Sequence, residues 1–454
     1  MKKAAKAINK TNEQCGETSM KSISKYNRIL AFATGTCSLL ALTVGAVAEN
    51  VVVQWDQFSN TGITAAGPAM DELIKVCEAD LKDTKILRTI VPSIGIRESY
   101  RLAVSANKTP DLAYTWPAAS VLAGYARTGK VAPLDAYYAK YKWDNVNAFY
   151  RGRNSYQGKI YAVPMEQDLM GVYFNRDLFK KLGLEIPKTY AEFKSVVEKV
   201  KDAGLIPIAF GNRDRWPATN TMSLIMGLST GRANEEKVFF GNEPWSNPGF
   251  KLAAETFQQW GKDGYFPKGF NGIGYDEANA LFLGGKAAMN MTGTWVLQDM
   301  ARGAKFDLGV FMLPPIGDGV AEGTMWGEGS QWQVSATADD AAKDAAAAYI
   351  NCLTSAANRQ TWVEKGFVVP IGTTPEDLGK WNTLPVVKEF YTNGLKTPDT
   401  NFYDLHTTVP ESVTQVLYPE LQKLVGGDAT PDEFLAAMDV SWKAAVDNGE
   451  RWAP

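Results

Sequence analysis

The stretch from Gly158 to Phe179 places the strongest constraint on the fold that this chain can adopt. An apolar run from Ile160 to Pro164 and a second run from Met170 to Phe174 flank the polar residues 166–168. Short apolar runs bounded by polar residues are typical of buried strands. Because the composition changes little on either side, we interpret the stretch as a crossing between two similar lobes. The polar turn is then expected in the cleft between them.

The length of the chain supports two lobes, because 454 residues exceed what a single hydrophobic core usually holds. Strand-like and helix-like patterns alternate along it. The β-branched run from Val51 to Trp55 predicts a strand, and the three-and-four spacing of apolar residues over 70–81 predicts a helix. The same alternation returns over residues 189–210. It predicts an α/β fold with right-handed crossovers.

The expected lobes are discontinuous in the sequence. We expect lobe 1 to comprise residues 49–163 and 298–367, and lobe 2 to comprise residues 164–297 and 368–454. No internal repeat or low-complexity linker is visible. The lobes should therefore be joined by several short crossings rather than by one tether.

The N-terminus predicts export. Three basic residues precede an apolar run from Ile29 to Val47, which ends in the small-x-small pattern of residues 46–48 that a signal peptidase reads. The alternative is a membrane anchor, but polar and glycine residues over 34–38 dilute the run. We expect residues 1–48 to be a cleaved signal peptide, with Met20 as an alternative start.

A soluble periplasmic protein is the expected product of that processing. The residues before Cys37 do not resemble the motif that directs lipid attachment, and no later segment is long and apolar enough to span a membrane. Only Cys77 and Cys352 follow the leader. Each falls on an apolar helix face, so we expect free buried thiols, with a disulfide between them as the alternative.

Charge and composition exclude several kinds of partner and site. Residues 1–48 carry seven Lys or Arg and two Glu, which leaves 40 basic against 48 acidic side chains in the remainder. No basic cluster follows the leader, so nucleic acid is not an expected partner. His406 is the only histidine and no G-x-S-x-G motif is present. We expect no catalytic triad, no metal site and no cofactor.

Glu166 and Asp168 form the one carboxylate pair that suggests catalysis. Two such groups are the acid and base of most glycosidases. Two carboxyls in one loop are also compatible with a solvated turn or with hydrogen-bond acceptors for sugar hydroxyls. A secreted carbohydrate hydrolase or lyase is therefore the alternative hypothesis for this chain.

Tryptophan is the over-represented residue, with 13 in the chain. An indole stacks on the C–H face of a sugar ring while neighbouring polar groups bind the hydroxyls. Several tryptophans follow or flank apolar runs, where a parallel sheet opens its ligand crevice. These are Trp55, Trp116, Trp216, Trp295, Trp326 and Trp332. We expect Trp332, which lies inside a strand pattern, to belong to the core.

Four segments together carry a resemblance to a known family. In order, they are TPDLAYTW at Thr109–Trp116, the long stretch from Gly158, FLGGKAAMNMTGTW from Phe282, and WGEGSQW from Trp326. From about Val51 onward the chain resembles the extracellular solute-binding proteins of ABC importers. Within these it is similar to the carbohydrate-type group that includes the maltodextrin-binding proteins.

The resemblance implies two α/β lobes, a hinge of crossover strands and one ligand closed between the lobes. Mapped onto this chain, the cleft positions of the family are Trp55, Asp56, Trp116, Glu166, Gln167, Asp168, Trp216, Thr294, Trp295, Trp326 and Glu328. Arg213 and Arg215 lie beside Trp216 in the sequence. They leave an acidic sugar open as the ligand.

A partner set follows from the same resemblance. We expect a monomer that binds a sugar or oligosaccharide and docks transiently on an inner-membrane ABC permease. A ligand-presenting protein for a chemoreceptor is a further alternative.

Overall fold

The structure is a computed structural model, and it describes residues 50–59, 66–116, 119–143, 146, 148–326, 330–395 and 401–452. The expected signal peptide and its cleavage point lie outside the described residues, as does Glu328. Residues 48–454 form one compact unit.

The first sheet is mixed and has five strands. In spatial order they are β2 (Thr84–Ile90), β1 (Asn50–Asp56), β3 (Leu112–Thr115), β12 (Gln331–Val334) and β6 (Ala162–Pro164). The β1 strand runs parallel to β2 and β3, whereas β12 runs antiparallel to β3 and β6. Gln331 pairs with both Thr115 and Pro164, so the late strand β12 joins two early segments.

The second sheet has four strands and begins where the crossing ends. Its order is β10 (Leu308–Phe311), β7 (Met170–Asn175), β9 (Ala287–Gly293) and β8 (Ile206–Ala209). All residues of β7 and β9 are buried. This continuous burial explains why both strands read as unbroken apolar or small-residue runs.

One expected boundary between the lobes is wrong. The chain was expected to return to lobe 1 at residue 298, but β10 pairs antiparallel with β7 in the second sheet. The segment after Trp295 therefore forms α13 (Leu297–Gly303) and an edge strand of that sheet before the chain leaves it. The chain still contacts this part of the protein at residues 316–317, whose N–H groups donate to Leu228 O, and at Thr324, whose Oγ1 donates to Met170 O. It rejoins the first sheet only at β12.

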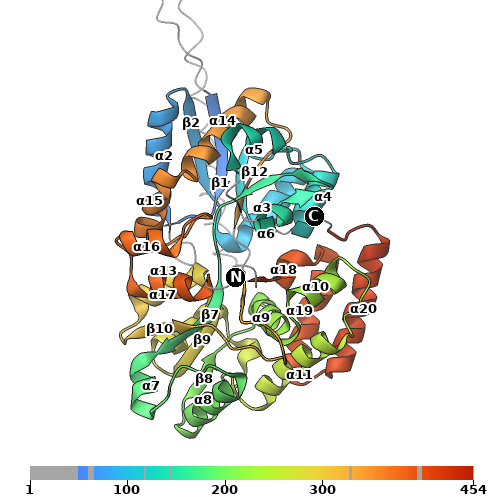
Figure 1. Cartoon of the computed structure of the whole chain (residues 1–454). Helices are drawn as coiled ribbons and strands as arrows, with labels where there is room; N and C mark the ends of the chain where they lie inside the picture. Colours follow the sequence, from blue (N-terminus) through green and yellow to red (C-terminus); the bar gives the residue numbers. More distant parts are fainter. Residues whose placement is uncertain are drawn as a thin grey trace, which may run out of the picture. The chain divides into compact units, whose positions relative to one another are not determined.

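Helices surround both sheets. In the segments around the first sheet they are α2 (Gly67–Leu81), α3 (Ser93–Ser105), α4 (Ala119–Arg127), α5 (Asp135–Tyr141), α6 (Ala148–Arg153), α14 (Asp340–Leu353) and α15 (Ala356–Gly366). In the segments around the second sheet they include α7 (Arg176–Leu182), α8 (Tyr190–Asp202), α9 (Trp216–Thr230), α10 (Arg232–Phe239), α11 (Pro248–Lys262) and α12 (Tyr275–Leu283). The C-terminal third adds α16 (Pro375–Lys380), α17 (Pro385–Gly394), α18 (Leu405–Thr408), α19 (Glu411–Gly426) and α20 (Pro431–Asp447). Figure 1 shows α8 beside β8, and α9, α11, α19 and α20 on one side of the second sheet.

None of the helices in the described part of the chain combines the length and the apolar content that crossing a membrane requires. The helix α9 is buried on all sides, since every residue from Pro217 to Ser229 is buried. Its amide and hydroxyl side chains are therefore enclosed by protein, which matters for the site described below.

Short bridges connect the crossing segments to one another. Glu166 pairs with Pro370, and Leu169 pairs with Trp326, each as an isolated antiparallel bridge. Two small ladders, β11 (Thr324–Met325) with β13 (Asn401–Phe402) and β4 (Ser155–Tyr156) with β5 (Lys159–Ile160), complete the strands. Three segments far apart in the sequence thus meet at the polar turn.

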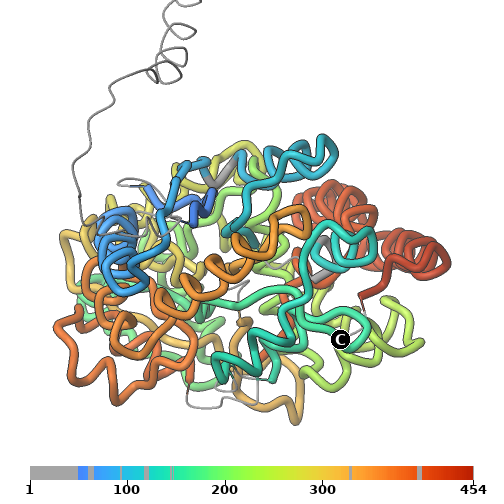
Figure 2. The backbone as a smooth tube through the Cα atoms, turned by 90° about the horizontal axis from the view of Figure 1, so that it is seen from above, coloured from blue at the N-terminus to red at the C-terminus, as the bar shows by residue number. Residues whose placement is uncertain are grey.

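The expectation of free thiols is also wrong, because Cys77 and Cys352 form a disulfide. Cys77 lies on the buried face of α2, and Cys352 lies near the end of α14. Figures 1 and 2 show α2, in blue, beside the orange helices α14 and α15. The Cα atoms of the two cysteines are 5.8 Å apart, within the range that a disulfide needs. Two apolar helix faces that pack on each other can bring cysteines together as readily as they can bury free thiols.

Candidate binding site

The polar turn at residues 166–168 is buried, although its composition suits a solvated loop. Gln167 joins the polar turn to the segment at residues 369–373. Its backbone N–H donates to Val369 O at 2.9 Å, and its Nε2 donates to Pro370 O and Thr373 O, both at 3.1 Å. Because both amide protons are used in this way, Gln167 serves mainly to join the crossings.

Asp168 is tied to the second sheet through Thr294. Thr294 Oγ1 donates to Asp168 Oδ1 at 3.0 Å, and the Leu169 N–H donates to Thr294 Oγ1 at 3.2 Å. Glu166 is buried nearby. Its burial, and secondly the charge of Asp168, raise the pKa of Glu166 well above the usual range of a carboxyl. A buried carboxyl that holds its proton, next to a second buried carboxyl, can offer a hydrogen-bond donor to a polyhydroxylated ligand.

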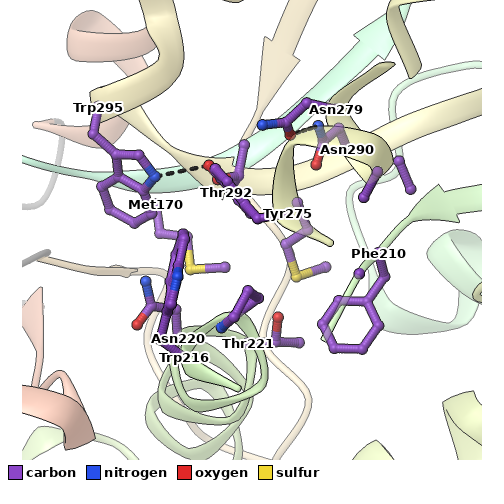
Figure 3. Close-up of a pocket in the computed structure, with 15 residues that line it drawn as sticks. Met170, Phe210, Trp216, Asn220, Thr221, Tyr275, Asn279, Asn290, Thr292 and Trp295 are labelled. Atoms are coloured by element: carbon purple, nitrogen blue, oxygen red, sulfur yellow. Dashed lines mark hydrogen bonds between the residues drawn. The ribbon is translucent and has the colours of Figure 1, made fainter. Parts of the chain in front are cut away.

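An aromatic cluster lies at the end of β9, where residues 294–296 form a short 3-10 helix. Trp295 Nε1 donates to Tyr275 Oη at 2.8 Å, and that hydroxyl lies 2.7 Å from Thr292 Oγ1. Trp216 packs against the Tyr275 ring at 4.4 Å and lies 6.3 Å from the Trp295 ring, nearly perpendicular to it. Figure 3 shows Trp216 and Trp295 on one side of the pocket and Phe210 on the other.

Local backbone features position the two indoles. Trp216 is the first residue of α9, and Arg215 before it has a φ of 69°, a left-handed conformation that is uncommon for a residue with a side chain. A Cβ atom at Gly293 would lie 2.0 Å from the Trp295 ring, so glycine is required for the indole to fold back over the strand end. Strained or glycine-dependent backbone of this kind is concentrated at functional sites.

The pocket beneath these rings is small. Its lining leaves about 10 Å³, roughly the space of one water molecule. Asn220 on the first turns of α9 contributes to the lining, and its Oδ1 is buried without a hydrogen-bond partner in the described part of the chain. An unpaired buried amide oxygen costs free energy unless a ligand or water satisfies it. Asn220 is therefore a further polar candidate in this cluster.

Asp56 and Trp55, the two residues of the expected site on β1, differ in burial and in hydrogen bonding. Asp56 is fully buried, and Arg88 donates to both of its carboxylate oxygens at 2.7 Å. Gln54 Nε2 and the Phe58 N–H donate to the same carboxylate at 2.6 and 2.9 Å. These four hydrogen bonds make Asp56 a structural residue rather than a sugar contact. Trp55 is half-buried and is the penultimate residue of β1, between the buried Gln54 and Asp56.

Trp116 is half-buried after β3, and the Arg97 guanidinium lies 5.7 Å from its ring centroid. The structure does not bring Trp55 or Trp116 into ring contact with Trp216 or Trp295; among the described residues, no such aromatic pair occurs. Trp55 and Trp116 therefore lie at the first sheet, apart from the ring contacts that join Trp216 and Trp295 at the second sheet.

Trp326 and Trp332 are both buried but differ in what surrounds them. Trp332 is 0% exposed and packs on Tyr114 at 4.6 Å, which confirms that it belongs to the core. Trp326 is stacked on Tyr150 from α6 at 5.1 Å and 29°. Within the described residues, Trp326 Nε1 and Tyr150 Oη are both buried without a hydrogen-bond partner. The nearby Asp168 charge adds to burial in raising the pKa of Tyr150.

Arg213 is committed to the protein surface. Its Nη1 lies 3.2 Å from Glu277 Oε2, and both side chains are more than half exposed. Glu277 also accepts a hydrogen bond from the Gly274 N–H at the start of α12. The acidic-sugar hypothesis based on Arg213 thus loses its main support, because this guanidinium already has an anionic partner.

Three candidate residues were not predicted from the sequence: Tyr150, Asn220 and Tyr275. Asn220 had a usable signal, because the polar residues 219–221 interrupt the otherwise apolar α9. Tyr150 and Tyr275 had none, because each reaches its site only through contacts with residues distant in the sequence. In the described part of the chain, no group of three or more His, Cys, Asp or Glu side chains is arranged to hold a metal ion.

Comparison with known proteins identifies the family. Residues 72–388 match the family described as bacterial extracellular solute-binding protein. The chain belongs to this family. A multiple sugar-binding protein of Streptococcus mutans is 25% identical to this solute-binding protein over 262 residues, which are 56% of this chain and 61% of the relative. The chain thus spans about three fifths of the length of that relative.

Solved structures show the same fold. A chitin oligosaccharide binding protein matches with a TM-score of 0.77 and 22% identity, over 87% of this chain and 99% of the other. The GacH receptor of Streptomyces glaucescens matches with a TM-score of 0.72 and 21% identity, over 88% and 99%. These matches confirm the expected two-lobed α/β fold of periplasmic solute-binding proteins.

The family assignment also decides between the two classes of function. The family is described as bacterial extracellular solute-binding protein. The hydrolase or lyase alternative, built on Glu166 and Asp168, finds no support. The resemblance drawn from the sequence segments is confirmed.

Proposed function

We propose that this solute-binding protein captures a sugar or oligosaccharide between its lobes and delivers it to the permease of an ABC importer. In this proposal the protein is exported with cleavage of residues 1–48, works as a periplasmic monomer and docks transiently on the permease. The names of relatives such as the multiple sugar-binding protein support a carbohydrate ligand.

The observation that carries the proposal is the cluster of Trp216, Tyr275 and Trp295 beside the unpaired Asn220 oxygen. Two half-buried indoles next to buried polar groups are the combination that binds sugar rings. Because the pocket holds about one water, we infer that it is one edge of the binding site. The ligand would complete the site when it lies against both sheets.

The proposed ligand contacts come from both lobes. On the first sheet they are Trp55 and Trp116. At the crossings and the second sheet they are Glu166, Asp168, Trp216, Thr294, Trp295 and Trp326. Glu328, which lies outside the described residues, remains a contact that the family resemblance predicts. Asp56, Gln167 and Arg213 would instead support the structure through the partners described above. We propose lobe 1 as residues 49–163 and 330–367, and lobe 2 as the remainder of the mature chain.

A thermal-shift screen of the purified protein against mono- and oligosaccharides tests the proposal. A ligand that binds only the folded state raises the melting temperature by mass action. We expect at least one saccharide to do so, and the Trp216→Ala variant to lose that shift. If amino acids, peptides or metal ions shift the melting temperature and no saccharide does, the carbohydrate assignment is wrong.

A further inference from the structure

A groove of about 740 Å³ lies outside the aromatic pocket. It is lined by α3, by α4, by the first turns of α19 and by residues 449–451 after α20. Binding sites for small molecules commonly occupy about 300 to 1,000 Å³. The groove therefore has room for several sugar rings, whereas the pocket in Figure 3 does not.

The charged side chains that line the groove are unequal in sign. Five are cationic and three are anionic. The cations are Arg97, Arg101, Arg127, Lys130 and Arg451, and the anions are Glu98, Glu411 and Glu450. An excess of positive charge in a concave site attracts anionic ligands more strongly than the same charges on a flat surface.

Three of these cations have only neutral hydrogen-bond partners among those observed. Arg127 donates to Gly449 O at 3.0 Å, Arg451 donates to Gly241 O at 2.8 Å, and Lys130 donates to Asn107 Oδ1 at 2.6 Å. Such bonds orient the side chains without pairing them with a carboxylate. By contrast, Arg101 is paired with Glu98.

Arg97 is the group that joins the groove to the predicted binding site. It approaches Glu411 only to 4.0 Å, the limit of an ion pair, and its Nη2 is buried without a hydrogen-bond partner in the described part of the chain. Its guanidinium also lies over Trp116. Arg97 therefore has an unused donor beside a predicted sugar-stacking residue.

Two tyrosines, Tyr125 and Tyr156, give the groove aromatic surface. Burial raises the pKa of Tyr125, and the charges of Arg97 and Arg101 oppose that rise. The charges of both guanidiniums thus act on the Tyr125 hydroxyl. The combination of aromatic rings, hydroxyls and guanidiniums suits a sugar that also carries carboxylates.

We propose that the groove binds an acidic oligosaccharide, a short chain of uronic acid units, with one carboxylate on Arg97. This inference rests on the proposed function and names its ligand class: the groove would extend the proposed site beyond the aromatic pocket, through the contact of Arg97 with Trp116. It relocates the acidic-sugar hypothesis from Arg213, which is paired with Glu277, to the groove beside Trp116.

Calorimetric titration of the intact mature protein tests the inference. The probes are the trimers of galacturonate, glucuronate and mannuronate, each compared with its uncharged methyl ester. We expect at least one acid to bind more tightly than its ester, and this preference to weaken as salt rises. Arg97→Gln should lower the preference by about ten-fold to a hundred-fold, the usual effect of losing a hydrogen bond to a charged group.

Glu411→Gln is the matched control. It breaks the same Arg97–Glu411 contact but leaves the guanidinium in place, so the preference for the acid should hold or increase. If Glu411→Gln lowers the preference as much as Arg97→Gln, the contact is a structural link and the inference is wrong. If neutral saccharides bind but no acid exceeds its ester, the inference falls while the proposed function stands. If no saccharide of either kind binds, both fall.

Discussion

The disulfide offers the sharpest test of how the discontinuous first lobe is stabilised. It joins α2, near the start of the mature chain, to α14, which follows the last strand of the first sheet. The loop that it closes spans 275 residues and contains the whole second sheet. A bond across so long a loop removes much of the conformational freedom of the unfolded chain.

The size of the effect follows from the loop length. The chain-entropy relation gives about 5.6 kcal/mol at 25 °C for this loop, and measured losses on disulfide removal are about 2 to 5 kcal/mol. We therefore expect Cys77→Ala/Cys352→Ala to lower the free energy of unfolding by about 3 to 5 kcal/mol. For a cooperative unit of about 400 residues, this corresponds to roughly 4 to 6 °C in melting temperature.

The assay is urea unfolding of three samples: the oxidised wild type, the wild type with reductant, and the double alanine variant. Reduction keeps both sulfur atoms, so it separates the bond from the packing of Cys77, which is fully buried. Reductant should destabilise the wild type and leave the variant unchanged. If both reduced wild type and variant unfold within about 1 kcal/mol of the oxidised protein, the loop-closure reasoning is refuted.

Three further predictions address the site and the export of the protein. Trp295→Ala removes apolar contact worth about 1 to 3 kcal/mol, so it should weaken sugar binding by about ten-fold to over a hundred-fold. Its melting temperature should change little. Trp332→Ala, in the core, should instead lower the free energy of unfolding by about 3 to 5 kcal/mol. If Trp295→Ala melts far lower yet binds sugar normally, its ring is part of the core. Because the folded state holds the Glu166 proton more tightly than the unfolded chain, wild-type stability should fall as pH rises from about 4.5 through the folded-state pKa. Glu166→Gln has no proton to lose at this position, so its melting temperature should rise relative to that of the wild type as the pH increases over the same range. A difference in melting temperature that does not change with pH would contradict the raised pKa. Mass spectrometry of protein from the native compartment should find Glu49 as the first residue, whereas an uncleaved N-terminus would overturn the proposed processing.

The sequence by itself determined the features that depend on short-range patterns. Apolar runs and three-and-four spacing identified β1 to within one residue and α2 to within three, because neighbouring residues decide whether a segment can bury one face. The core position of Trp332 followed from its place inside a strand pattern. The ordered segments around Gly158 and Phe282 were enough to indicate the family.

Only the tertiary structure decided which groups meet. The pairing of Cys77 with Cys352, the place of β10 in the second sheet and the binding of Asp56 by Arg88 all join segments that are distant or uninformative in sequence. The same holds for the contact of Tyr275 with Trp295. The physical reason is that local periodicity fixes which face of an element is buried but not which other element covers it. Whether a tryptophan or a carboxylate reaches a ligand or a protein partner depends on that second choice.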